Sequence, residues 1–226
     1  MTVPRGRAIC LVSGGMDSCV AAAVAAGENP ALAFFHASYG QRTARRELQA
    51  FHEIGDFYKI TDRLVCRLYH LARIGGSALT DPGIAVPEGR LDRPEIPVSY
   101  VPFRNTNILS AAVAWGEVLK AGRIYIGAVQ EDSSGYPDCR ETFFQAYQKV
   151  VELGTRPETR IEILTPLIHL SKAEIVRRGI ALHAPLHLTW SCYQQEEAAC
   201  GRCDSCLHRL RGFQQAGVPD PIRYME

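Results

Sequence analysis

Apolar residues in the sequence form short continuous runs that alternate with longer segments of helical spacing. The first run, residues 8–12, is apolar throughout, as expected of a strand buried on both faces of a sheet. Further runs of this kind predict strands over residues 31–35, 64–68, 124–129 and 161–164.

The segments between these runs predict helices. Residues 19–26 are rich in alanine, and Leu48, Phe51, Ile54 and Phe57 fall on one face of a helix over residues 43–58. Further helices are expected over residues 106–120, 141–153 and 171–179. Residues 72–104 are rich in glycine and proline and predict a long functional loop. Strands separated by helices indicate an α/β fold with an open, mainly parallel sheet and helices on both faces, whose ligands sit at the carboxyl ends of the strands.

Composition narrows the class of protein further. The 226 residues are 46% hydrophobic and 22% charged, with a net charge of +1, which gives a nucleic-acid partner no support. No apolar run is long enough to span a membrane, and the first seven residues make a poor secretory signal, so we expect a cytoplasmic protein. We expect one α/β domain over residues 1–180 and a small metal-binding segment over residues 181–226 packed on it.

A glycine-containing hexapeptide, Ser13-Gly14-Gly15-Met16-Asp17-Ser18, follows the first predicted strand. Its glycines let an anion approach the main chain, and amides at the start of the next helix favour phosphate. The hexapeptide lacks the lysine of a Walker A loop. The alternative is a plain strand–helix turn whose serine and aspartate cap the helix.

Cys192, Cys200, Cys203 and Cys206 are clustered with the spacing C-x7-C-x2-C-x2-C. The two close steps direct successive thiolates at one point, and Cys192 can complete a tetrahedron, which favours a structural zinc site. A 4Fe–4S cluster and redox disulfides remain alternatives, although no Cys-Pro follows as in many iron–sulfur motifs.

Other polar segments stand where strands are expected to end. Singly, each has a structural explanation: Tyr136-Pro137-Asp138 is ordinary turn chemistry, and Ser171 with Glu174 is a capping box. Lys172 is less easily explained, because a positive charge in the first turn opposes the helix dipole. The segments are YGQR (39–42), REL (46–48) on the helix that follows, VPFRN (101–105), GAVQED (127–132), GYPDCR (135–140), PL (166–167), SKAEI (171–175) and TWSCY (189–193).

The hexapeptide resembles the SGGxDS loop of the PP-loop ATP pyrophosphatases. With the polar segments and the cysteines, in this order from about residue 8 to residue 206, the chain resembles the 7-cyano-7-deazaguanine synthase (QueC) family. The resemblance implies an adenine nucleotide α-hydrolase-like fold and a ligase that forms C–N bonds. It implies conversion of 7-carboxy-7-deazaguanine and ammonia to the nitrile through adenylated acid and amide, with ATP and Mg²⁺ as co-substrate, a structural zinc ion and a homodimer. Residues 72–98 could not be aligned with the family pattern.

The resemblance also implies residue roles. ATP is expected over Ser13, Gly14, Gly15, Met16, Asp17 and Ser18. The expected catalytic residues are Asp17, Lys172, Arg140 and Asp138. Substrate is expected to contact Gln41, Arg104, Asn105, Glu131, Asp132 and Tyr136. Asp138 and Glu131 can accept N–H groups from a guanine-like edge, and Phe103, Tyr136 or Trp190 can stack on the base.

Other functions stay open at this point. A tRNA-thiolating enzyme would use a pocket cysteine such as Cys139, but thiolating enzymes usually carry a tRNA-binding appendage, and no basic arm is present. A homologue that forms an amide of deazaguanine would differ in its product. A non-enzymatic zinc-ribbon interaction module would leave the hexapeptide unexplained and would not exchange pyrophosphate.

Overall fold

The chain folds around a parallel five-stranded sheet. The computed structural model describes residues 6–90, 95–130 and 135–225. The strands are ordered β3-β2-β1-β4-β5. Their bounds are β1 Arg7–Leu11, β2 Ala31–Ser38, β3 Arg63–Arg67, β4 Arg123–Ile126 and β5 Glu162–Leu164. The helices are α1 Met16–Glu28, α2 Ala44–Phe57, α3 His70–Ile74, α4 Arg104–Leu119, α5 Glu141–Gly154, α6 Lys172–Ala181 and α7 Asp204–Ala216, with 3-10 turns η1 Pro137–Cys139 and η2 Leu186–Leu188.

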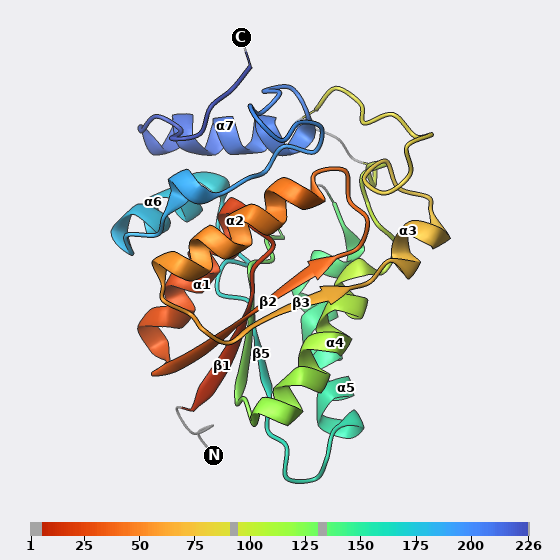
Figure 1. Cartoon of the computed structure of the whole chain (residues 1–226), viewed down its shortest axis with the longest axis vertical. Coiled ribbons are helices and arrows are strands. Elements are labelled where there is room, and N and C mark those ends of the chain that lie inside the picture. Colours follow the sequence, from red (N-terminus) through yellow and green to blue (C-terminus); the bar gives the residue numbers. More distant parts are fainter. Residues whose placement is uncertain (1–5, 91–94, 131–134, 226) are drawn as a thin grey trace.

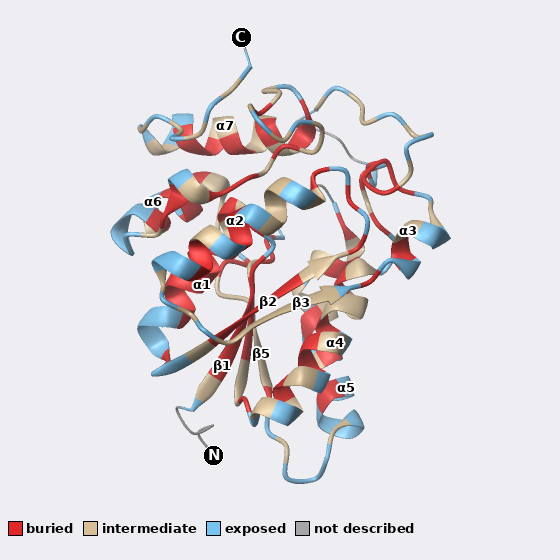
Figure 2. Ribbon diagram, in the orientation of Figure 1, coloured by how far each residue is buried: buried red, intermediate tan, exposed pale blue. Residues whose placement is uncertain are grey.

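Helices cover both faces of the sheet, as the hydrophobic pattern predicts. α1, α2, α6 and α7 lie on one side, and α4 and α5 lie on the other (Figure 1). Alternate residues of β1 enter the two cores, Ala8 and Cys10 on the first side and Ile9 and Leu11 on the second. Residues 8–11 of this strand are apolar, as suits a strand whose two faces are both buried (Figure 2).

The strand order places a crevice at the carboxyl end of β1. Leu11 pairs with Phe35 of β2 on one side and with Ile126 of β4 on the other. The chain winds outward from β1 to β2 and β3 on one side, then returns to add β4 and β5 on the other. Such a reversal leaves the crevice in which open α/β sheets bind ligands.

The predicted strands and helices are all present, with some shifted ends. α1 begins at Met16, inside the hexapeptide, and β4 ends at Ile126, three residues before the predicted end. Two helices, α3 and α7, were not predicted. Asp204 in the first turn of α7 and Gly217 in the left-handed conformation after its last turn are the start and stop signals that indicate it.

The C-terminal segment packs closely on the rest of the chain. α7 crosses α6 so closely that a Cβ atom on Gly212 would lie 2.8 Å from Cβ of Lys172. The domain boundary at residue 180 stays a prediction; α6 itself ends at Ala181. Within the described ranges, no helix is both long and apolar enough to cross a membrane.

Candidate active site

The hexapeptide forms a tight loop between β1 and α1. Gly14 has φ +94°, and a Cβ atom on it would lie 2.6 Å from the backbone oxygen of Glu47, so only glycine fits. The Ser18 hydroxyl donates to the Gly15 carbonyl (2.9 Å) and lies 3.1 Å from the Ser13 hydroxyl, which donates to it. The two serines therefore hold the shape of the loop.

The amino end of α1 is open towards ligands. Its N-cap residue, Gly15, is extended, and no side chain in the described part of the chain caps this helix. Lys172 Nζ donates to Asp17 Oδ2 at 2.6 Å, which explains a lysine in the first turn of α6. Asp17 Oδ1 is buried and has no hydrogen-bond partner among the described residues. The uncapped backbone amides of α1, the Lys172 ammonium group and Asp17 Oδ1 therefore lie at the same end of this helix.

A cavity of about 290 Å³ opens at this edge of the sheet. Its walls come from the carboxyl ends of β1, β2 and β4, the start of α4, and the segment from Trp190 to Arg209. The lining polar and aromatic residues include Ser13, Asp17, Ser18, Tyr39, Gln41, Thr43, Glu47, Arg104, Asn105, Tyr136, Cys139, Lys172, Trp190, Ser191, Tyr193, His208 and Arg209.

Arg104 presents a cation to this cavity. Its Nη1 donates to the Tyr39 hydroxyl at 3.2 Å, and the guanidinium lies 5.6 Å from the Tyr39 ring and 5.9 Å from the Tyr136 ring. Within the described ranges, no carboxylate lies within ion-pair distance of Arg104. A half-buried guanidinium without a counter-ion attracts an anionic ligand.

Asn105 and Asp138 fasten α4 to the turn η1. The Asn105 backbone N–H donates to Asp138 Oδ2 at 2.9 Å, and Asn105 Nδ2 donates to the Asp138 carbonyl at 2.8 Å and to Cys139 Sγ at 3.4 Å. Asp138 is 3% exposed, and its Oδ1 has no partner within the described ranges. Burial raises the pKa of the Cys139 thiol to about 11, so this cysteine is neutral near pH 7.

Gln41 and Thr43 hold the carboxyl group of Glu47 at the cavity wall. Gln41 Nε2 donates to Glu47 Oε2 at 2.9 Å, and Thr43 Oγ1 donates to Oε1 at 2.8 Å. Gln41 Oε1 accepts from the Tyr39 backbone at 2.9 Å. The side-chain amide of Gln41 therefore links the Tyr39 backbone to the Glu47 carboxylate by two hydrogen bonds.

The cavity brings together most of the residues predicted for the site, with six exceptions. Gly14 and Asp138 are not among its lining residues. Arg140 is exposed at the start of α5 and does not line the cavity. Phe103 is 59% exposed, and Glu131 and Asp132 lie outside the described residues. Glu47 and Arg209 also line the cavity, and the sequence assigned neither of them a role. Residues 46–48 were marked as a polar segment on the helix after the second strand, whereas no local signal marks Arg209.

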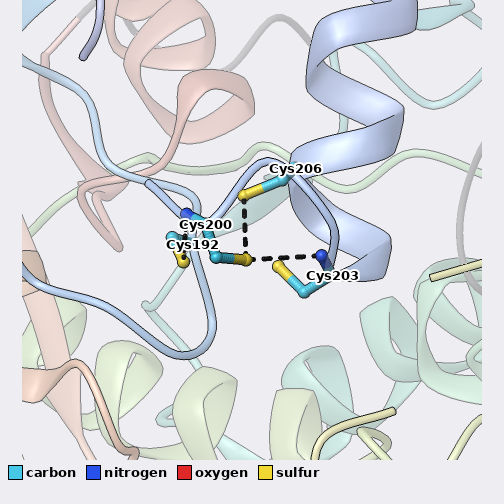
Figure 3. A group of neighbouring side chains, drawn as sticks. All are labelled: Cys192, Cys200, Cys203 and Cys206. Carbon is cyan, nitrogen blue, oxygen red and sulfur yellow. Dashed lines mark hydrogen bonds between the residues drawn. The ribbon is translucent and has the colours of Figure 1, made fainter. Parts of the chain in front are cut away.

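The four clustered cysteines converge on one point (Figure 3). Their sulfur atoms all lie within 4.8 Å of one another, and a tetrahedral zinc–thiolate site needs sulfurs about 3.8 Å apart. Hydrogen bonds from Cys203 and Cys206 hold the pKa of the Cys192 thiol well below its usual range. The backbone N–H groups of Gln195 and Cys200 also donate to Cys192 Sγ, at 3.3 and 3.4 Å. These thiols can hold a metal ion.

Arg209 joins the cysteine cluster to the cavity. It lies three residues after Cys206, is 2% exposed and donates twice to Asp220, at 2.7 and 2.9 Å. Its other N–H groups donate to Thr189 Oγ1 (2.7 Å), Ser191 Oγ (3.4 Å) and the Leu186 carbonyl (3.4 Å). With all five donors used inside the protein, Arg209 positions the cavity wall and has none left for a ligand.

Comparison with known proteins gives consistent results over nearly the whole chain. A sequence profile described as "Queuosine biosynthesis protein QueC" matches residues 7–217. The chain is 59% identical to the 7-cyano-7-deazaguanine synthase of Chlorobaculum tepidum and 57% identical to that of Chlorobaculum parvum, over 96% of both chains in each case. A crystal structure of a 4-thiouridine synthetase–RNA complex with bound ATP matches with TM-score 0.53 at 18% identity, covering 94% of this chain and 50% of that chain, which shows a shared fold.

Proposed function

The chain belongs to the QueC family of queuosine biosynthesis, and on that basis we propose that it is a 7-cyano-7-deazaguanine synthase. It converts 7-carboxy-7-deazaguanine and ammonia to 7-cyano-7-deazaguanine at the expense of ATP. The observation that carries the proposal is one cavity with the phosphate-type loop, residues 13–18, at one side and Arg104 in its wall, a cation that has no carboxylate partner among the described residues.

The ATP half of the site consists of the loop and its neighbours. Phosphates lie against the amides of Gly14 to Ser18, where the glycine backbone and the helix amino end favour negative charge. Lys172 adds a positive charge, and Asp17 holds that lysine. The buried Asp17 Oδ1 is the oxygen suited to the Mg²⁺ that accompanies ATP.

The substrate half uses Arg104 and the turn at Asp138. Arg104 pairs with the carboxylate of the substrate, and the neighbouring Tyr39 and Tyr136 offer ring faces to the planar base. Asp138 is the residue we assign to an N–H group of the guanine-like edge: its buried Oδ1 has no partner in the described part of the chain, and its neighbours Asn105 and Cys139 line the cavity although Asp138 itself does not. Asn105 fixes Asp138 for this role.

The reaction needs two activations at one carbon atom. A carboxylate oxygen attacks the α-phosphate of ATP, pyrophosphate leaves, and ammonia then displaces AMP to give the amide. A second adenylation on the amide oxygen followed by loss of AMP leaves the nitrile. The protein mainly positions the reactants and stabilises negative charge, since neutral Cys139 is poorly suited to act as a nucleophile.

The four cysteines would hold zinc, which would supply a fixed tetrahedral point for the C-terminal segment. Their sulfur-only ligand set suits zinc and leaves no open position for catalysis. In the same proposal residues 1–180 form the ATP-binding domain, residues 181–226 form the zinc-binding segment, and the enzyme is a cytoplasmic homodimer that binds no nucleic acid. Metal analysis and sedimentation of the purified protein test these points.

The test of function is a product assay. Incubation with ATP, Mg²⁺, ammonium and 7-carboxy-7-deazaguanine is expected to give the nitrile, detected by mass. A product that stops at the amide would identify an amide-forming homologue, and unchanged acid would contradict the proposal. The Asp17→Asn variant is the control, because it removes the charge that binds Lys172 and should give no product.

A further inference from the structure

Glu47 is a carboxylate of the cavity wall that has no cation partner among the described residues. The other carboxylate in that wall, Asp17, is paired with Lys172 at 2.6 Å. Glu47 instead accepts from two neutral donors, Gln41 and Thr43. Each of its oxygens keeps a further lone pair, so the carboxylate can accept two more hydrogen bonds.

The environment of Glu47 makes it a better base than an exposed glutamate. Burial raises its pKa, against the opposing effects of the hydrogen bonds from Gln41 and Thr43 and of the Arg104 charge, while Glu196 adds to the rise. A desolvated carboxylate with unused lone pairs favours a cation that can also give up a proton.

Glu47 lies between the two halves of the site. Its backbone oxygen lies so close to Gly14 of the phosphate-type loop that a Cβ atom on Gly14 would be only 2.6 Å away. Its side chain is tied through Gln41 to Tyr39, whose hydroxyl accepts from Arg104. In the proposed reaction the adenylated carbon must lie between the phosphate-binding loop and the cation that binds the carboxylate, and Glu47 borders that space.

We propose that Glu47 binds the nitrogen donor as ammonium and accepts its proton, so that ammonia is released beside the adenylated carbon. This inference rests on the function proposed above. Ammonium transfers one proton to the Glu47 carboxylate, and the nitrogen lone pair forms the C–N bond. The C–O bond to AMP breaks with its electron pair on the departing phosphate. A second proton leaves the nitrogen for the AMP phosphate, and Glu47 returns its own proton to solvent.

Recognition of the guanine-like edge is the competing role for such a carboxylate. That edge lies across the ring system from the carboxyl substituent, so a residue beside both the loop and the Arg104–Tyr39 pair is placed for the carboxyl end. The far edge is assigned above to Asp138, whose Oδ1 has no partner among the described residues. The position of Glu47 therefore favours ammonium.

The test separates acid activation from amination. Glu47→Gln keeps the size of the side chain and removes its charge, and Glu53→Gln on the same helix, outside the cavity wall, is the matched control. In Glu47→Gln, pyrophosphate exchange that depends on the acid without ammonium should stay within about threefold of the wild type. Amide formation from ammonium should fall by roughly 100-fold in kcat/KM for ammonium.

Hydroxylamine, used in place of ammonium, distinguishes loss of the Glu47 charge from a structural defect. A structural defect would slow hydroxamate formation as much as amide formation. Hydroxylamine is a neutral nucleophile at the assay pH, so it needs no carboxylate to capture and deprotonate it. Glu47→Gln should form the hydroxamate at about the wild-type rate, within roughly threefold. Glu47→Asp, which keeps the charge on a shorter arm, should lie between wild type and Glu47→Gln for ammonium, and it serves as the second variant if Glu47→Gln does not fold.

Three results would overturn the role of Glu47. The first is an unchanged kcat/KM for ammonium in Glu47→Gln, and the second is an equal loss of hydroxamate and amide formation. The third is a raised KM for the acid with an unchanged KM for ammonium, a result that would assign Glu47 to the guanine-like edge of the base. Failure of the proposed function looks different, because the wild-type protein itself would then show no pyrophosphate exchange dependent on 7-carboxy-7-deazaguanine.

Discussion

The two sides of the cavity are built by different means. The loop from Ser13 to Ser18 is held by hydrogen bonds between residues at most five apart and by two glycines. The opposite wall, from Trp190 to Tyr224, is held by four thiols, by the buried Arg209–Asp220 pair and by the pairing of Ala199 with Tyr224. The first side follows from local chain geometry, whereas the second depends on contacts between residues farther apart in the chain and, in the function proposed above, on a metal ion.

The two sides also touch. The Trp190 backbone donates to the Gly14 carbonyl at 2.8 Å, and Gly212 of α7 packs on Lys172. The C-terminal segment that carries the cysteines therefore packs directly on the phosphate-type loop and on Lys172. Loss of the metal should disturb the cavity without unfolding the sheet, which separates the roles of the two sides.

The largest effect is expected from breaking the cysteine cluster. Cys203→Ser removes a buried ligand and should lower the free energy of unfolding by on the order of 5 kcal/mol. Bound metal, measured by mass spectrometry of the native protein, should fall below the wild-type content. Cys66→Ser, outside the cluster, is the control. Full metal content in Cys203→Ser would contradict the ligand assignment.

Breaking the buried ion pair is expected to have a slightly smaller effect. Asp220→Ala leaves the Arg209 charge buried without its partner, which should cost about 4 kcal/mol in urea unfolding. The control is Asp62→Ala, because the Arg7–Asp62 pair is exposed and worth less than about 1 kcal/mol. Equal losses in the two variants would show that burial does not distinguish the pairs.

On the loop side, a single charge should affect activity far more than stability. Asp17→Asn weakens the hold on Lys172 and removes the charge at the buried Oδ1, so pyrophosphate exchange should fall by roughly 100- to 1,000-fold. Its thermal midpoint should stay close to that of the wild type. A variant that unfolds, or one that keeps its exchange activity, would contradict the assignment of Asp17 to the ATP site.

The smallest effect is expected at the start of α6. Ser171 and Glu174 form a complete capping box, so Ser171→Ala should destabilise the protein by about 1 kcal/mol. Lys172 directly follows the cap residue, so the KM for ATP reports whether the cap positions this lysine. We expect this KM to rise only slightly, because the loop side is held mainly by its own hydrogen bonds. A large rise in KM would show that the cap positions the lysine.

The sequence could predict those features that leave a local pattern. The apolar strands, the hexapeptide and the spacing of the four cysteines depend on residues close in the chain. The structure has the strands, the tight loop and the converging sulfurs where they were expected. Lys172 was marked as unusual by its position against the helix dipole, and its partner is Asp17.

The remaining site residues owe their positions to contacts across the fold. Arg209 reaches the cavity because α7 packs on α6, and Glu47 faces it because Gln41 and Thr43 turn its carboxylate inward. The local sequence marks residues 46–48 only as polar and gives no signal for Arg209. Arg140 ends the segment that contains the buried Asp138, but it is exposed and does not line the cavity, so its catalytic role stays a prediction.

The most direct measurement follows isotope-labelled ammonium into product. With ATP, Mg²⁺ and 7-carboxy-7-deazaguanine, the wild-type protein should release 7-cyano-7-deazaguanine whose nitrile nitrogen carries the label. Recovery of unlabelled acid, or a labelled product that stops at the amide, would contradict the central claim.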